Sequence, residues 1–165
     1  MNEIIGSTLK TLQKSKYLLE KLTDSQLCDT SIAPYYSSIG THLRHILDFY
    51  DCILNITGKK IDLTARRRNK VVESNCDSAQ QYLDTIVDEL TVTNFDMEGN
   101  VRVLDDLGLG TIEITYTYGA LFSQANSHTI HHYAIINYIL KGLGITFKDS
   151  DFGYNPTTPK QTTLG

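Results

Sequence analysis

Three of the five histidines in this chain lie between Ser127 and Tyr133, inside a proline-free apolar run from Leu121 to Leu143. Spacings of four and three residues join Leu121, Ala125, His128, His132, Ile135 and Ile139. This period predicts a helix over residues 118–142 whose core-facing stripe contains two imidazoles. Because residues four apart point from one face of a helix, His128 and His132 can both reach one metal ion. His131 is turned by about 100° from His132 and is expected beside the stripe.

The other two histidines, His42 and His45, lie in a second apolar run, from Ile39 to Ile56. They share one helical stripe with Phe49, Cys52 and Ile56, and an equally regular apolar stripe runs beside it through Ile39, Leu43, Ile46, Tyr50 and Ile53. The pattern predicts a helix over about residues 38–57, capped by Ser37 or Ser38. Periodicity alone does not choose between His42 and His45 as the residue nearer to a metal.

Two interpretations of these histidines are open. A single histidine on an apolar face is more often a neutral, hydrogen-bonded core residue than a metal ligand. Several imidazoles in one core, however, leave many nitrogens to satisfy, at about 1–3 kcal/mol for each one left unpaired. A divalent ion removes that cost by taking a lone pair from each ring. The clustering of all five histidines therefore favours a metal site.

The rest of the chain predicts two further helices and a β-hairpin. Apolar residues at helical spacing predict a helix over 3–22 and another from Asp77 or Ser78 to about residue 90. Alternating residues at 101–103 and 112–116 predict the hairpin, whereas residues 23–38, 59–76 and 151–159 have no period. We therefore expect an all-α fold, a single-domain four-helix bundle over about residues 3–145. It has a long crossover between its second and third helices, a small hairpin before its fourth, and an irregular tail over about residues 146–165.

Charge and cysteine content narrow the classes of function. The net charge is −4, and the only dense basic cluster, Arg66-Arg67-Arg68, is short enough to be a solvated loop. We therefore expect no nucleic-acid partner and no membrane partner. The three cysteines, Cys28, Cys52 and Cys76, form no C-x-x-C motif, and the first residues do not read as a signal peptide. These features predict a cytoplasmic protein without disulfides or a cysteine nucleophile.

Two motifs resemble the DinB-like superfamily of metal-binding four-helix bundles, which includes bacillithiol- and mycothiol-dependent enzymes. Residues 38–46 are similar to the second-helix signature of that superfamily, whose ligand stands five residues after the glycine. Residues 127–133 are similar to its fourth-helix H-x-x-x-H signature. The resemblance covers about residues 3–145. It implies a divalent ion (nickel, zinc, iron or manganese) held by His45, His128 and His132.

The resemblance leaves other positions open. His42 is extra, and is either a fourth ligand or a hydrogen-bond partner of a ligand ring, and His131 is a flanking residue. Many members follow the last ligand with Arg-Gly, where this chain has Tyr133-Ala134. A substrate contact made at that position does not carry over to this chain.

The resemblance implies a fold and a metal more directly than a reaction. Three imidazoles leave an open face on an ion, where a bound water or thiol has a lowered pKa. The leading hypothesis is a metal-dependent thiol S-transferase or related detoxification enzyme that joins a low-molecular-weight thiol to an electrophilic small molecule. The alternatives are a metal-dependent hydrolase and a non-catalytic bundle that binds a metal or small molecule. Asp48 and Glu73 are weak candidates for acid or base residues, and the two wide apolar stripes of residues 39–56 predict a homodimer.

Overall fold

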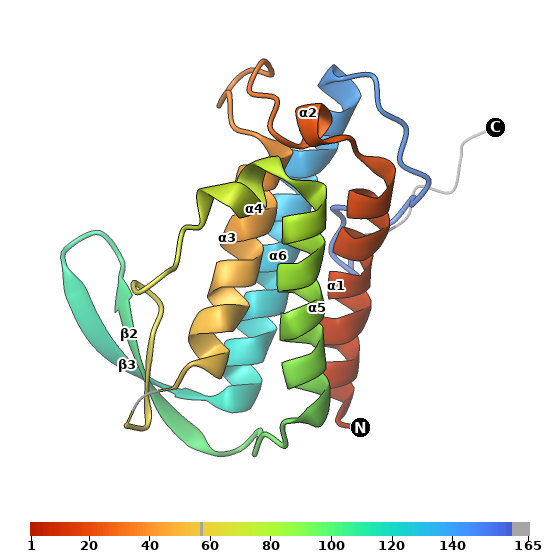
Figure 1. The fold of residues 1–165 in the computed structure, drawn as a ribbon. Helices are drawn as coiled ribbons and strands as arrows, with labels where there is room; N and C mark the ends of the chain where they lie inside the picture. The colour runs from red at the N-terminus through yellow and green to blue at the C-terminus, as the bar shows by residue number, and fades with distance from the viewer. Residues whose placement is uncertain (57, 160–165) are drawn as a thin grey trace.

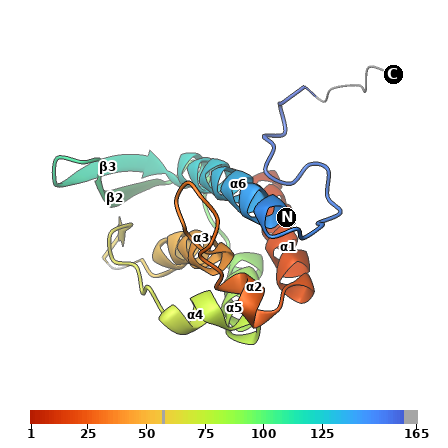
Figure 2. The same cartoon turned by 90° about the horizontal axis from the view of Figure 1, so that it is seen from above.

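The computed structural model describes residues 1–56 and 58–159 of the chain. Four long helices pack side by side: α1 (Glu3–Lys21), α3 (Ile39–Leu54), α5 (Cys76–Val92) and α6 (Tyr118–Gly142) (Figures 1 and 2). Helices α1 and α6 run in one direction and α3 and α5 in the other. The apolar periods of the sequence predicted all four helices, with bounds that differ by a few residues at most.

The helix starts follow from capping side chains. Ser38, one of the two predicted caps of α3, accepts a hydrogen bond from the Thr41 backbone N–H at 3.0 Å. Helix α5 begins earlier than predicted, because Asn75 rather than Asp77 or Ser78 is its cap. The Asn75 side chain accepts from the backbone N–H of Ser78 at 2.8 Å. Asn75 also follows directly after a short helix over Lys70–Ser74, which the sequence pattern did not predict.

The prediction of an all-α fold was wrong, because a three-stranded mixed sheet is part of the structure. The predicted hairpin is confirmed as β2 (Asn100–Asp106) and β3 (Thr111–Thr117), which pair antiparallel. Strand β1 (Lys60–Asp62) lies in the segment expected to be an irregular crossover, and it pairs parallel to β2. Ile61 of β1 is buried opposite Val103. A strand this short has no period that a sequence can reveal, so its docking on β2 defines it.

Two short helices also lie in segments predicted to lack structure, α2 (Asp24–Leu27) and α4 (Lys70–Ser74). Helix α2 begins with a capping box in which Thr23 and Gln26 each accept the other's backbone N–H. Helix α4 lies directly on α3, since a Cβ atom at Gly40 would stand 1.9 Å from the carbonyl oxygen of Glu73. The crossover that returns from the end of α3 to the start of α5 is confirmed (Figure 1), although it contains β1 and α4.

The two stripes of α3 have different surroundings. The apolar stripe is the core, with side chains at most 1% exposed at Ile39, Leu43, Ile46, Tyr50 and Ile53. On α6 the buried face includes Phe122, Ala125, Thr129, Tyr133, Ile136 and Leu140. His128 and His132 are therefore half-buried at the edge of this face, and their predicted place within the core stripe was only partly right. The histidine rows of α3 and α6 face one another at the rim of the core.

The apolar core stripe of α3 is buried by other elements of the same chain. Its core stripe is buried and Cys52 is 5% exposed, so these residues no longer argue for a second copy. The homodimer stays a prediction that light scattering would test. Within the described ranges, no helix combines the length and the apolar character needed to cross a membrane.

The C-terminal tail packs on the helices, with Phe152 as its buried side chain. Phe152 is buried against Tyr133, with ring centroids 4.6 Å apart. As predicted, residues 146–159 contain neither helix nor strand, and residues 160–165 lie outside the described residues. The sheet projects to one side of the helices, beyond α3 and α6 (Figure 2).

Candidate metal site

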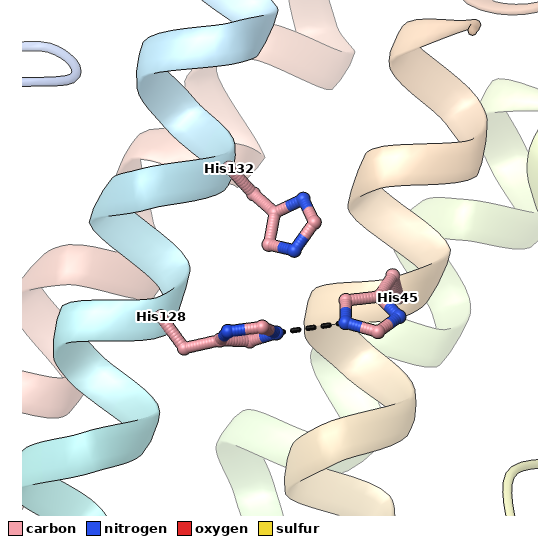
Figure 3. Close-up of side chains that lie close together, drawn as sticks. All are labelled: His45, His128 and His132. Carbon is pink, nitrogen blue, oxygen red and sulfur yellow. Dashed lines mark hydrogen bonds between the residues drawn. The ribbon is translucent and has the colours of Figure 1, made fainter. Parts of the chain in front are cut away.

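Three histidines from two helices converge at the rim of the core. His45 on α3 and His128 and His132 on α6 each offer one ring nitrogen, and these nitrogens all lie within 4.8 Å of one another. Figure 3 shows the three rings pointing into the space between the two helices. The Nε2 atoms of His45 and His128 are 2.7 Å apart. The structure thus places His45, and not His42, in the group that the H-x-x-x-H pair completes.

The donor set fits a divalent ion such as zinc. Nitrogens bound to one ion at about 2.0–2.1 Å lie about 3.4 Å apart in a tetrahedral site. The Nε2 atoms of His45 and His128 lie 2.7 Å apart and all three ligand atoms lie within 4.8 Å of one another, so small side-chain adjustments would bring the rings to coordination distance. Among the described residues the group consists of three imidazoles. Three neutral imidazoles are typical of a catalytic zinc site, where the remaining position takes water or substrate.

The histidines of the site are held in the neutral state that binds metal. Burial lowers the pKa of His45 from 6.5 to about 4, and His128 and the cation of Arg66 add to the effect. Burial and the surrounding imidazoles lower the pKa of His132 to about 2. The pKa of His128 is also lowered, first by burial and then by His131 and Arg66. At neutral pH these rings therefore have lone pairs to offer to a cation.

His42 is a hydrogen-bond partner of the candidate ligand His132, the second of the two roles that the sequence left open for it. Its Nδ1 lies 2.8 Å from Nδ1 of His132, and its Nε2 lies 2.7 Å from the Ser37 hydroxyl. When His132 donates from Nδ1 to His42 and His42 donates from Nε2 to Ser37, Nε2 of His132 keeps a free lone pair. A ligand imidazole is usually fixed in this way, by a hydrogen bond from the nitrogen that does not bind the metal.

Arg66 contacts the opposite end of the group, although the sequence pattern placed it in a solvated loop. Its Nη1 donates to Nδ1 of His45 at 2.6 Å, and its side chain is half-buried. Its neighbour Arg67 is exposed, as predicted, and pairs with Asp51 at 2.9 Å. Burial lowers the pKa of Arg66, and repulsion from Arg68 and Arg44 adds to this shift. No local signal distinguishes Arg66 from Arg67, because the contact with His45 spans 21 residues.

His131 is not part of the converging group. Its side chain is exposed, and its ring centroid lies 5.4 Å from that of His132. With His128 it lines an open depression of about 570 Å³ on the flank of α6, together with Ala120, Ser123, Gln124 and Ser127. The surface of α6 beside His128 is therefore open to solvent.

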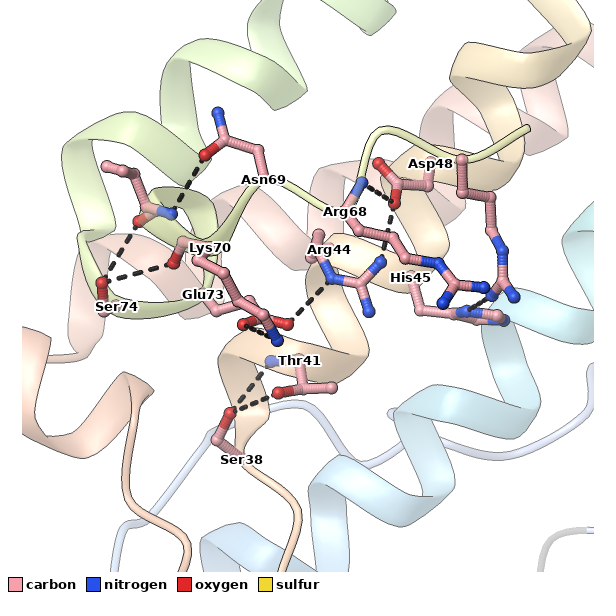
Figure 4. A network of polar contacts seen from close by, with 12 residues as sticks. Ser38, Thr41, Arg44, His45, Asp48, Arg68, Asn69, Lys70, Glu73 and Ser74 are labelled. Atoms are coloured by element: carbon pink, nitrogen blue, oxygen red, sulfur yellow. Dashed lines mark hydrogen bonds and ion pairs between the residues drawn. The ribbon is translucent and has the colours of Figure 1, made fainter. Parts of the chain in front are cut away.

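The two carboxylates considered as acid or base residues belong to a buried network centred on Arg44, and Figure 4 draws both of them with Arg44 and Arg68. Asp48 is 0% exposed and accepts from Arg44 at 2.7 Å, from the Arg68 backbone N–H at 3.1 Å and from the Tyr82 hydroxyl at 2.8 Å. Glu73 accepts from Arg44 at 2.9 Å. These bonds tie α3 to α4, α5 and the crossover, and they leave Asp48 without a free oxygen for the metal site.

Tyr133 and Cys52 are not part of the candidate metal site. The Tyr133 hydroxyl lies 2.6 Å from the Ser15 hydroxyl and donates to the Thr11 carbonyl, so the side chain that follows His132 points into the core. Burial raises the pKa of the Cys52 thiol to about 11, which agrees with the prediction that this cysteine is not a nucleophile.

Comparison with known proteins identifies no relative, since the chain matches no protein-family model, no curated protein and no solved structure. The resemblance to the DinB-like superfamily therefore rests on the sequence motifs alone.

Proposed function

We propose that this protein is a metal-dependent thiol S-transferase that binds one divalent metal ion through His45, His128 and His132. The observation that supports it most is the convergence of three ring nitrogens, all within 4.8 Å of one another, from two helices. The contact between Nδ1 of His132 and Nδ1 of His42 adds support, because Nε2 of His132 is free to coordinate when His132 donates in it. The thiol chemistry rests on the DinB-like resemblance of the two histidine motifs.

The ion would supply Lewis-acid chemistry, lowering the pKa of a bound thiol so that a thiolate is available near neutral pH. The protein's own residues hold the site in shape. The buried stripe of α3 fixes the rotation of that helix and turns His45 towards α6. His42 and Ser37 fix the ring of His132, and half-burial of the three rings limits their protonation.

The metal proposal is tested by titration of the metal-free protein with Zn²⁺ against a chromophoric chelator, together with elemental analysis of the purified protein. Wild type should bind one equivalent, and His128→Ala should lose tight binding because only two ligands remain. His131→Ala is the matched control, since it removes an exposed histidine of the same helix that lies outside the converging group. Equal affinity of wild type and His128→Ala would refute the proposed site.

The reaction is tested with the metal-loaded protein and a panel of thiols and electrophiles. We expect thiol consumption that is lost on chelation, restored by metal, and absent in His128→Ala. Hydrolysis of ester or amide substrates without any dependence on thiol would replace the transferase with a metal-dependent hydrolase. A protein that binds metal tightly and turns over neither class would be a metal-binding bundle without catalysis.

A further inference from the structure

Arg66 is a half-buried cation without an acidic partner. Among the described residues, no carboxylate oxygen lies within 4.0 Å of its guanidinium, whereas Arg44 and Arg67 each form ion pairs. The Nε atom of Arg66 is buried and has no hydrogen-bond partner within the described chain. Asp48, an acidic group whose charge acts on Arg66, already accepts from three other groups. A guanidinium held in this way lacks the anion that normally accompanies it.

The hydrogen bond that Arg66 donates to His45 is incompatible with coordination of a metal ion through Nε2 of His45. A guanidinium can only donate, so Nδ1 of His45 must accept and the ring proton must lie on Nε2. That proton points to Nε2 of His128, the other candidate ligand atom on this side of the site. When Nε2 of a neutral His45 coordinates an ion, its proton moves to Nδ1, where it meets the N–H groups of Arg66. Coordination therefore releases Arg66 from His45 and leaves its guanidinium in need of a new acceptor.

The charge around the site favours an anion as that acceptor. A divalent ion with three neutral ligands keeps its full charge of about +2, and Arg66 adds a further positive charge beside it. Nη1 of Arg66 lies 2.6 Å from Nδ1 of His45, so the cation stands directly beside one of the three candidate ligands. The α6 surface beside His128 is open to solvent, so a small molecule can approach this side of the site.

We infer that Arg66 and the three-histidine centre together form a subsite for a small substrate that carries a carboxylate. Once the guanidinium of Arg66 is released from His45, it pairs with this carboxylate. This inference rests on the proposed metal function and names its substrate class. A guanidinium and a carboxylate form two parallel hydrogen bonds, a geometry that a hydroxyl or an amide cannot reproduce.

The first test measures metal affinity in metal-free wild type, Arg66→Gln and Arg67→Gln. The amide side chain introduced by Arg66→Gln offers a carbonyl oxygen to His45 Nδ1–H, so Co²⁺ and Zn²⁺ should bind about 10–100-fold more tightly than in wild type. Arg67→Gln, which breaks only the exposed pair with Asp51, should bind as wild type does. If Arg66 merely anchors the crossover to α3, Arg66→Gln should weaken metal binding instead, and the inference is then overturned.

The second test measures anion recognition in the Co²⁺-loaded protein, followed through the cobalt absorption. Mercaptoacetate and 2-mercaptoethanol present the same thiol with a carboxylate or with a hydroxyl. Wild type should prefer mercaptoacetate by about 10–100-fold, as a charge-assisted hydrogen bond predicts. Arg66→Gln should lose this preference while it keeps its affinity for 2-mercaptoethanol, and Arg66→Lys should keep part of it. A preference that survives in Arg66→Gln would refute the carboxylate subsite.

Glycolate, which has the carboxylate but no thiol, separates this inference from the proposed function. If neither thiol binds the cobalt protein but glycolate binds in an Arg66-dependent manner, the thiol transferase is refuted and the carboxylate subsite stands. If Co²⁺ binds and glycolate affinity is the same in wild type and Arg66→Gln, the subsite is refuted and the metal centre stands. Failure of wild type to bind Co²⁺ at all would refute both.

Discussion

Replacement of His42 by alanine tests how the site is built, because His42 touches a candidate ligand without belonging to the converging group. It is 9% exposed and is hydrogen-bonded on both nitrogens, to His132 at 2.8 Å and to Ser37 at 2.7 Å. Its loss frees the His132 ring to rotate and removes the nitrogen that leaves Nε2 of His132 free to coordinate when it accepts from Nδ1 of His132. Loss of such a partner typically costs about 10–100-fold in metal affinity, which corresponds to about 1.4–2.7 kcal/mol.

The matched variant is His45→Ala, which removes one of the three converging nitrogens. Two ligands from one helix hold an ion far less tightly than three from two helices, so this variant should lose tight binding altogether. Zn²⁺ competition titrations of wild type, His42→Ala and His45→Ala should therefore rank in that order. Ser37→Ala removes only the outer hydrogen bond of His42 and should cost less than His42→Ala does.

Two results would refute this reasoning. If His42→Ala binds no metal while His45→Ala still does, the choice of His45 as the ligand is reversed. If His42→Ala binds Zn²⁺ with the affinity of wild type, the hydrogen bond to His132 does not orient a ligand. Thermal melts of the metal-free variants, run alongside, show whether each variant is folded under the conditions of titration.

Other predictions concern the folding of the metal-free protein, measured by urea denaturation. Because the pKa of His45 falls from 6.5 to about 4 on folding, the unfolded chain binds the extra proton between these values. The contribution of neutral His45 to the free energy of unfolding is fully present above pH 6.5 and is lost as pH falls towards 4. His45→Gln should therefore flatten the loss of stability in this window, and an unchanged pH profile would contradict the lowered pKa. Asp48→Ala should cost about 3–5 kcal/mol by leaving Arg44 and its other donors buried without that acceptor, whereas Arg67→Gln should cost less than about 1 kcal/mol, and similar costs would contradict the structural network. Gly40→Ala should destabilise by about 1–3 kcal/mol through overpacking against α4, and a neutral effect would show that this helix does not lie on α3 as closely as the structure has it.

The sequence by itself determined the features that depend on local spacing. The long helices followed from apolar periods, and the hairpin from alternation on both sides of a glycine-rich turn. The pairing of His128 with His132 followed from their separation by one turn of α6, which holds wherever that helix packs. The resemblance of the two histidine motifs then suggested His45 as the third ligand, a choice that periodicity had left open.

Only the tertiary structure decided what depends on how distant segments meet. Helix α3 carries two regular stripes, and burial of the one through Leu43 and Tyr50 sets its rotation, which turns His45 towards α6. Strand β1 exists because Lys60–Asp62 docks on β2, which makes the fold mixed rather than all-α. The period of a segment tells which side chains share one face of a helix or strand. It does not tell how that element is rotated or placed relative to its neighbours. That rotation comes from the sum of many side-chain contacts across the core, and it is what brings Arg66 to His45.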